Sequence, residues 1–182
     1  MTPILVFMNE LQGALEAIRL SSNKSEIVNN SVGLATVSLR FHIGRVECDV
    51  AVMWDINQGD EKIKYVLPRK YKTLRPLNIT FRLDHDWSMG HIHTTVIHLE
   101  EALKSANHDA LFGFAIESGL SAHDAQAITV QHTEYIRESD VCTPYAHHRS
   151  RVIEMVIQNI LFIGNTILRW FEEELQPLLN NS

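Results

Sequence analysis

Residues 39–54, LRFHIGRVECDVAVMW, constrain the fold more than any other segment of the chain. The second half of this segment alternates between apolar and polar positions, which is the period-two pattern of a strand with one buried face. β-branched and aromatic side chains suit such a pleated surface. The apolar set comprises Val46, Cys48, Val50, Val52 and Trp54. The segment predicts the spine of a small antiparallel sheet.

The alternation changes phase in the middle of this segment. Leu39, Phe41 and Ile43 occupy odd positions, whereas the later apolar residues occupy even positions. The change falls at Gly44 and Arg45, where a bulge or a very tight turn would re-aim the chain.

The rest of the first half predicts one helix and further strands. Apolar residues recur every three or four positions in residues 4–20, which predicts an amphipathic helix that Gly13 weakens without breaking. Residues 21–32 are polar and predict a loop with an irregular start to the sheet. Residues 62–67 and 77–83 alternate again and predict two more strands. The expected structure of the first half is a helix with a three- or four-stranded antiparallel meander.

After residue 85 the apolar spacing becomes helical. Residues 88–106, 109–118 and 121–138 each predict a helix. The β-branched residues 94–97 leave a strand open as an alternative for part of the first of these helices.

The final helix is predicted to be long. Thr143 and Pro144 supply an N-cap followed by proline in the first helical position, and Pro177 ends a helix that reaches about Leu175. Gly164 is a candidate position for a bend. The helix is apolar nearly all round, so it is either fully buried or shared with a partner, and self-association or docking to another protein follows as a hypothesis.

The predicted fold class is therefore α+β, in two parts. Residues 1–85 form a small α+β module, and residues 86–182 form a C-terminal helical bundle of about four helices that ends in one long helix. The charge supports this division, because residues 1–85 hold 11 basic and 9 acidic residues, whereas residues 86–182 hold 5 and 13. This distribution argues against a general nucleic-acid binder.

Composition excludes several other classes of protein. Charged residues make up 21% and apolar residues 45% of the 182 residues, which is typical of a folded soluble domain and not of a disordered one. The apolar run at the N-terminus is too short for a signal peptide, and the final helix is too polar for a convincing membrane span. Two cysteines make no disulfide framework. A cytoplasmic protein is expected.

The first half resembles the trypsin-co-occurring domain family, particularly its second group. The resemblance covers about residues 4–85, where Cys48 stands in place of the usual leucine or valine. The matching patterns are Phe41-x-Ile43-Gly44-x-Val46-x-Cys48-x-Val50-x-Val52, Lys62-Ile-Lys-Tyr-Val and Asn78-Ile-Thr-Phe-Arg-Leu83. The family consists of small α+β modules that occur beside trypsin-like peptidases in bacterial conflict and defence systems. The resemblance implies a non-enzymatic adaptor or sensor, and it supplies no catalytic residue.

Nine of the ten histidines follow residue 84, and several of them fall on predicted helices. Helices that present inward histidines and a carboxylate are one way in which bundles build metal sites. Established ligand spacings such as HExxH, ExxH and CxxC are absent, and surface or hydrogen-bonded core histidines are the more common case. The candidate ligands for a transition metal are His91, His98, Glu101, His132 and His148.

Two further features of the sequence each allow a functional and a structural interpretation. Cys142 precedes His147 and His148, but a thiol nucleophile needs a base in contact and an electropositive setting, so an ordinary loop thiol is the simpler interpretation. A basic stretch is a candidate contact surface for phosphates or for an acidic protein, although a charged edge strand and loop that discourage edge pairing are the stronger interpretation. Its basic residues are Lys62, Lys64, Arg69, Lys70, Lys72 and Arg75.

No catalytic motif stands out, since a GxSxG elbow and a phosphate-binding loop are both absent from the sequence. We therefore expect a non-catalytic protein-interaction or adaptor module that requires no cofactor. Its expected partner is another protein, such as a peptidase or an NTPase of the same system, or a second copy of the chain. The alternative from a different class is a metal-binding enzyme or sensor with a histidine-rich site in the helical half.

Overall fold

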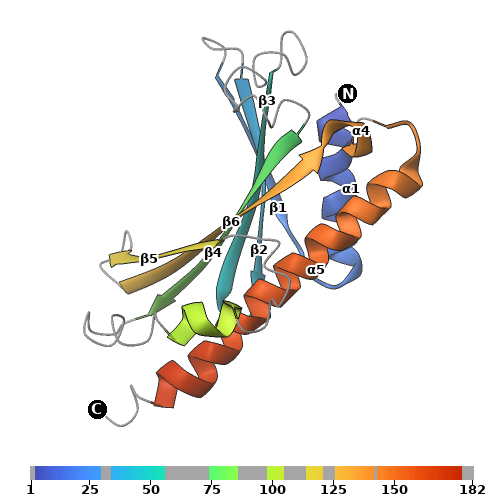
Figure 1. Ribbon diagram of the computed structural model, residues 1–182. Coiled ribbons are helices and arrows are strands. Elements are labelled where there is room, and N and C mark those ends of the chain that lie inside the picture. The colour runs from blue at the N-terminus through green and yellow to red at the C-terminus, as the bar shows by residue number, and fades with distance from the viewer. Residues whose placement is uncertain are drawn as a thin grey trace.

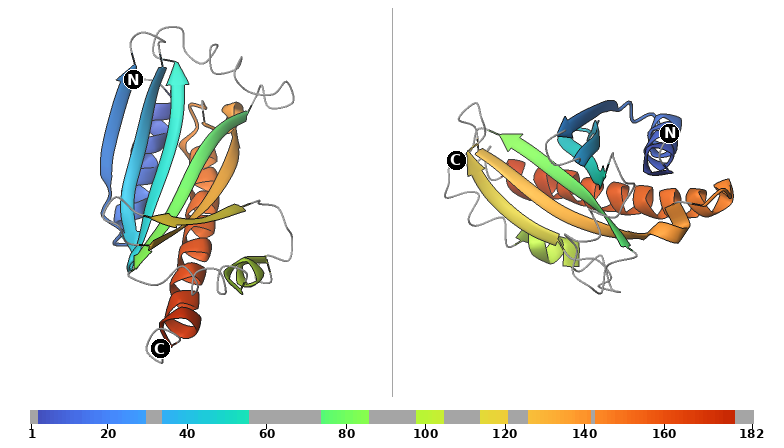
Figure 2. Two further views of the ribbon diagram at one scale, coloured as in Figure 1. Left: turned by 90° about the vertical axis from the view of Figure 1, so that its left-hand side faces the viewer. Right: turned by 90° about the horizontal axis from the view of Figure 1, so that it is seen from above.

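A six-stranded antiparallel sheet organises the chain (Figure 1). The computed structural model describes residues 3–29, 34–55, 74–85, 98–104, 114–120, 126–141 and 143–177. The sheet order is β1-β2-β3-β4-β6-β5, and the β5 end is turned strongly relative to the β1 end (Figure 2). The strands are β1 (Asn23–Asn29), β2 (Leu34–Ile43), β3 (Val46–Asp55), β4 (Leu74–His85), β5 (Phe114–Leu120) and β6 (Gln126–Arg137).

The change of phase in the sequence is a tight hairpin between β2 and β3. Ile43 pairs with Val46, so only Gly44 and Arg45 form the loop. Gly44 has a φ of 58° and Arg45 has no positive φ, which matches a type II′ hairpin turn. Because residues that pair across a hairpin share one face, an odd apolar set on β2 and an even set on β3 meet on the same side. The predicted tight turn is confirmed, and the described members of both sets, from Leu39 to Ile43 and from Val46 to Val52, are buried.

The sheet begins earlier than the sequence predicts. Residues 23–29, which fall within the predicted loop at 21–32, form the edge strand β1. Polar residues alternate with few apolar ones there because the outer side of this edge strand faces solvent, where Ile27 is 70% exposed. The predicted strand at 77–83 is confirmed as part of β4. The predicted strand at 62–67 lies outside the described residues.

Two predicted helices are wrong in the second half. Residues 114–118 of the expected helix at 109–118 belong to β5, and the expected helix at 121–138 is replaced by β6. The inward positions of β6 include Ile128, Val130 and Ile136, but two polar residues stand between them. These polar residues, His132 and Glu134, conceal the period-two pattern in the sequence. Within the described residues, two strands stand where two of the expected four helices would lie, so the predicted bundle is not confirmed.

Helices cover one face of the sheet (Figures 1 and 2). They are α1 (Pro3–Ala17), α4 (Glu138–Val141) and the long α5 (Ala146–Trp170), which continues as a π-helical turn, η2 (Phe171–Leu175). Residues 98–104, within the predicted helix at 88–106, are also helical. The amphipathic helix at the N-terminus and the long final helix are thus confirmed. By length and composition Ala146–Leu175 is apolar enough to cross a membrane, a property that buried core helices share.

Gly164 lets α5 lie close to the sheet. A Cβ atom added at Gly164 would lie 2.5 Å from Cδ1 of Ile43, at the end of β2. We therefore assign this glycine to close helix–sheet packing, in place of the bend that the sequence suggests. At the other end, α5 begins at Ala146, two residues after Pro144, and the Tyr145 backbone N–H donates to Oγ1 of Thr143.

One hydrophobic core contains residues from both sides of the expected boundary at residue 85. The core joins Phe7 and Leu11 of α1 to Val50 of β3, Val130 of β6 and Ile160 of α5. In addition, β4 pairs with β6 from Leu74–Arg137 to His85–Gln126, so the two predicted parts contribute strands to the same sheet.

Candidate binding groove

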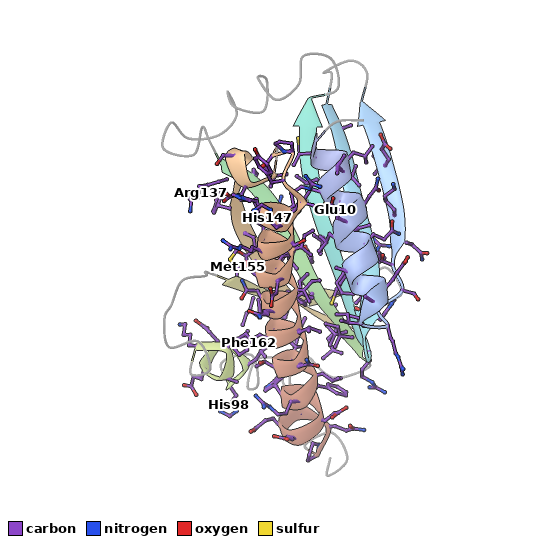
Figure 3. The ribbon with its side chains drawn as sticks, turned by 90° about the vertical axis from the view of Figure 1, so that its right-hand side faces the viewer. Glu10, His98, Arg137, His147, Met155 and Phe162 are labelled. Atoms are coloured by element: carbon purple, nitrogen blue, oxygen red, sulfur yellow. The ribbon has the colours of Figure 1, made fainter. Side chains whose placement is uncertain are left out.

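The candidate metal ligands lie on different elements. His98 and Glu101 are exposed on the helical residues 98–104, His148 is exposed near the start of α5, and His132 is buried in β6. Figure 3 shows His98 near one end of α5 and His147, the neighbour of His148, near the other. Among the described residues, no group of three or more His, Cys, Asp or Glu side chains is placed to hold a metal. His91 lies outside these residues, so the metal site stays a prediction.

The other candidates from the sequence lie mostly outside the described residues. This applies to Cys142 and to the basic residues Lys62, Lys64, Arg69, Lys70 and Lys72. Arg75 belongs to β4 by its backbone, and its side chain is likewise outside the described set. Cys48 is buried on β3, and burial raises the pKa of its thiol to about 12. A thiol with such a pKa is inert at neutral pH.

A partly buried polar cluster links β6 to α5. His132 is 2% exposed, and its Nε2 donates to Oε1 of Glu134 over 2.8 Å. The side-chain amide of Asn159 on α5 donates to the same carboxylate oxygen. Burial acts to raise the pKa of Glu134, but these two hydrogen bonds and the charge of His132 together lower it below its ordinary value of 4.5. Because all three polar side chains have partners, the cluster joins strand to helix, and we assign it a structural role.

An ion pair ties α1 to the start of α5. Nε of Arg149 donates to Oε2 of Glu10 over 2.9 Å, and Nη2 donates to Oε1 over 2.7 Å. Nη1 of Arg149 also donates to the carbonyl oxygen of Thr143 over 2.6 Å. The paired carboxylate raises the pKa of Arg149. A two-pronged contact of this kind fixes orientation as well as distance, so it holds the two helices side by side.

A groove of about 520 Å³ lies between α1 and α5, beside this ion pair. Its residues are small or apolar along the floor and polar at the rim. From the α1 side they are Glu10, Ala14, Ala17 and Ile18; from α5 they are Ala146, Ser150, Ile153, Glu154, Ile157 and Gln158. Figure 3 places Glu10 on this flank of α5.

The groove has the dimensions of a helix-binding site. Ala146, Ser150, Ile153 and Ile157 follow one another at helical spacing, and the stripe spans roughly 17 Å, or about three turns. Small side chains on both walls would allow another backbone to come close. Ile18 is 42% exposed at the end of the groove, where an apolar partner would cover it. The charged residues in the described part of the lining, Glu10 and Glu154, are both acidic.

The apolar circumference of α5 predicts a helix that is either fully buried or shared with a partner. Eight residues of α5 are buried in the fold, and sharing with a partner stays a prediction. Ile18 could have been found from the sequence, because it lies at the end of the apolar stripe on the predicted helix at 4–20. The pairing of Glu10 with Arg149 joins residues 139 positions apart, and no local pattern indicates it.

Comparisons with known proteins identify no relative of this chain. No family model, curated protein or solved structure matches the chain. The resemblance of residues 4–85 to the trypsin-co-occurring domains therefore stays a prediction.

Proposed function

We propose that the protein is a non-catalytic interaction module that binds an amphipathic helix of another protein in the groove between α1 and α5. The groove carries this proposal, because it combines an apolar floor about three turns long with an open, polar rim. The helix that fits has apolar residues at i, i+3, i+4 and i+7, which would cover Ile18, Ile153 and Ile157.

The rim charge supports a partner with basic residues. Glu154 is exposed and has no ion pair within the described part of the chain, whereas Glu10 is held by Arg149. Among the described residues, the lining contains no lysine or arginine. Lysine or arginine residues beside the apolar stripe of the partner would therefore complement the rim and favour this orientation over others.

The proposal is tested with an amphipathic leucine–lysine peptide of about 12 residues, or roughly three turns. The peptide carries a fluorophore, and anisotropy measures its Kd for the protein. We expect Ile18→Glu to weaken binding at least tenfold, because an apolar anchor buried in the complex contributes about 1.5–3 kcal/mol. Ile27→Glu is the matched control, since it makes the same change at an exposed isoleucine of β1, away from the groove.

A second pair of variants tests the rim. Glu154→Lys is expected to weaken binding of the basic peptide, and Glu173→Lys, at an exposed position of η2, is expected to leave it unchanged. Equal effects within either pair of variants, or no effect of Ile18→Glu, would remove the groove as the binding site.

We further propose that this module acts as an adaptor in a bacterial peptidase-linked defence system. Support for this part comes from the resemblance of residues 4–85 alone. Gene neighbourhoods test it directly: adjacent genes for a trypsin-like peptidase or an NTPase would support it, and their consistent absence would count against it. The second result would leave the groove proposal in place.

A further inference from the structure

The outer face of β1, β2 and β3, opposite the core, carries exposed apolar side chains at one level. These strands lie side by side in Figure 2, with α1 behind them. Ile27 of β1 pairs with Thr36 of β2, and Thr36 pairs with Met53 of β3, so the three side chains form one row across the face. Ile27 is 70% exposed and Met53 is 46% exposed. Exposed apolar side chains that lie together indicate a contact surface.

Further along the same face, basic side chains on β2 lie beside acidic side chains on β3. Arg40 and His42 of β2 pair with Asp49 and Glu47 of β3. Nε of Arg40 lies 3.6 Å from Oε1 of Glu47, and its Nη2 lies 3.4 Å from Oδ2 of Asp49. The Arg40 side chain is 60% exposed. A guanidinium group has five N–H donors, so Arg40 can bind a further carboxylate in addition to these two long contacts.

This outer face is complementary to itself under a two-fold rotation. An axis parallel to the strands, over the boundary between β2 and β3, lays β2 of each copy against β3 of the other, as in aligned packing of two sheets. Arg40 of each copy then meets Asp49 of the other, and Met53 meets the row of Ile27 and Thr36. The row between the apolar and the charged levels holds uncharged residues: Ser25, Ser38 and Ala51.

We propose that the outer face of β1–β3, with the adjoining part of β4, is an interface between two copies of this chain. A face of one sign would repel its own copy, whereas opposite signs on β2 and β3 favour a second copy over a partner of one charge. Four strands about 4.8 Å apart and four side-chain rows about 7 Å apart cover roughly 500 Å² per copy, or about 1,000 Å² in total, which is the lower limit for a specific interface. The area therefore predicts a weak, reversible dimer. The helix groove lies between α1 and α5 on the other side of the sheet, so neither proposal depends on the other.

Sedimentation velocity of the full chain over about 1–100 μM tests the dimer, because this range covers weak association. We expect monomers at the lowest concentration and dimers at the highest. Met53→Glu is expected to weaken the dimer at least about tenfold, because it places a charge in the apolar row. Ile18→Glu is the matched control, since Ile18 is 42% exposed but lies on the helix side of the sheet. It is expected to leave the dimer unchanged.

Two charge variants test the contact between copies. Arg40→Glu makes its own copy of the surface acidic, and Asp49→Arg makes its copy basic, so each variant alone is expected to stay monomeric where the wild type dimerises. An equimolar mixture is expected to form a heterodimer, because every cross-copy pair then joins opposite charges. Reversals in the exposed ion pair of Lys104 with Glu100, Lys104→Glu and Glu100→Lys, are the controls and are expected to leave the wild-type dimer unchanged. Thermal melts by circular dichroism verify that each variant is folded.

Three results would overturn the proposal. A wild-type monomer at every concentration would leave this face to a different partner. Equal effects of Met53→Glu and Ile18→Glu would place the dimer contact elsewhere. A mixture of folded Arg40→Glu and Asp49→Arg variants that stays monomeric would show that β2 of one copy does not meet β3 of the other.

Discussion

At the scale of single residues, Gly44 fixes the register of the central hairpin. Its positive φ closes the loop in two residues, and this short loop sets Ile43 opposite Val46. Leu168 of α5 lies over the turn, where a Cβ atom on Gly44 would approach Cδ2 of Leu168 to 2.9 Å. Gly44 therefore sets the strand pairing, and it lies directly beneath α5 at this point.

We expect Gly44→Ala to destabilise the protein by about 1–2 kcal/mol, because an L-residue at a left-handed φ is strained. The contact with Leu168 adds little, since the end of that side chain can move. Gly13→Ala makes the same substitution in the middle of α1, where a Cβ would have no neighbour within 4 Å. It is expected to stabilise by about 0.5–1 kcal/mol. Urea denaturation of both variants measures the difference, and shifts of the same sign would contradict this account of Gly44.

At the scale of elements, the attachment of β6 to α5 depends on polar as well as apolar contacts. Glu134 accepts hydrogen bonds from His132 on its own strand and from Asn159 on the helix. These contacts explain why two polar residues occupy inward positions of a strand. They also explain why the sequence does not indicate a strand there. Only Ile128, Val130 and Ile136 of the inward positions are apolar, so the period-two pattern is interrupted.

The lowered pKa of Glu134 leads to a prediction about the stability of the protein at acidic pH. A carboxyl whose pKa is lower in the folded state than in the unfolded state contributes stability above pH 4.5, and this contribution is lost as pH falls through the folded pKa. We therefore expect the stability gap between the wild type and Glu134→Gln to be smaller at about pH 3 than at about pH 5. Urea denaturation at both pH values measures this gap.

Glu117→Gln is the control, because Glu117 is an exposed glutamate on the neighbouring strand β5. Its effect on stability is expected to be small and to change little between the two pH values. A gap for Glu134→Gln that stays constant, or that widens in acid, would show that the hydrogen bonds do not favour the ionised carboxylate.

Local patterns in the sequence predict most individual elements of the first half. The hairpin, α1 and β4 follow from apolar spacing and one glycine, because each buries one regular face. The long α5 follows from its apolar length, but its predicted start is two residues early, because the N-cap is Tyr145 and not Thr143. β5 and β6 do not follow, since β5 is short and β6 buries a histidine and a glutamate that satisfy each other.

At the scale of the whole molecule, the arrangement depends on contacts between distant parts of the sequence. Pairing of β4 with β6 and the ion pair of Glu10 with Arg149 both cross the expected boundary at residue 85. The helix groove arises only where α1 and α5 lie side by side. Sequence patterns therefore predict the length and apolar character of α5, but they do not indicate which element lies beside it.

The shared core leads to a prediction about residues 1–85 on their own. Without the second half, the inner face of the meander would lose α5 and η2, which bury eight large apolar side chains, six and two respectively. At about 1.5–3 kcal/mol each, their burial contributes roughly 12–24 kcal/mol, which is as large as the total stability of a typical domain, about 5–15 kcal/mol. The edge of β4 would also lose its partner β6.

We therefore expect a fragment of residues 1–85 to give poorly dispersed NMR spectra and no cooperative unfolding transition. Addition of the separate fragment 86–182 is expected to restore dispersion if the two pieces assemble, because the missing core and strand then return. The intact chain is the control for both measurements. A cooperative transition and well-dispersed amides from residues 1–85 alone would instead establish that the first half is an independent domain, and the second half would then be an addition to a sheet that is already stable.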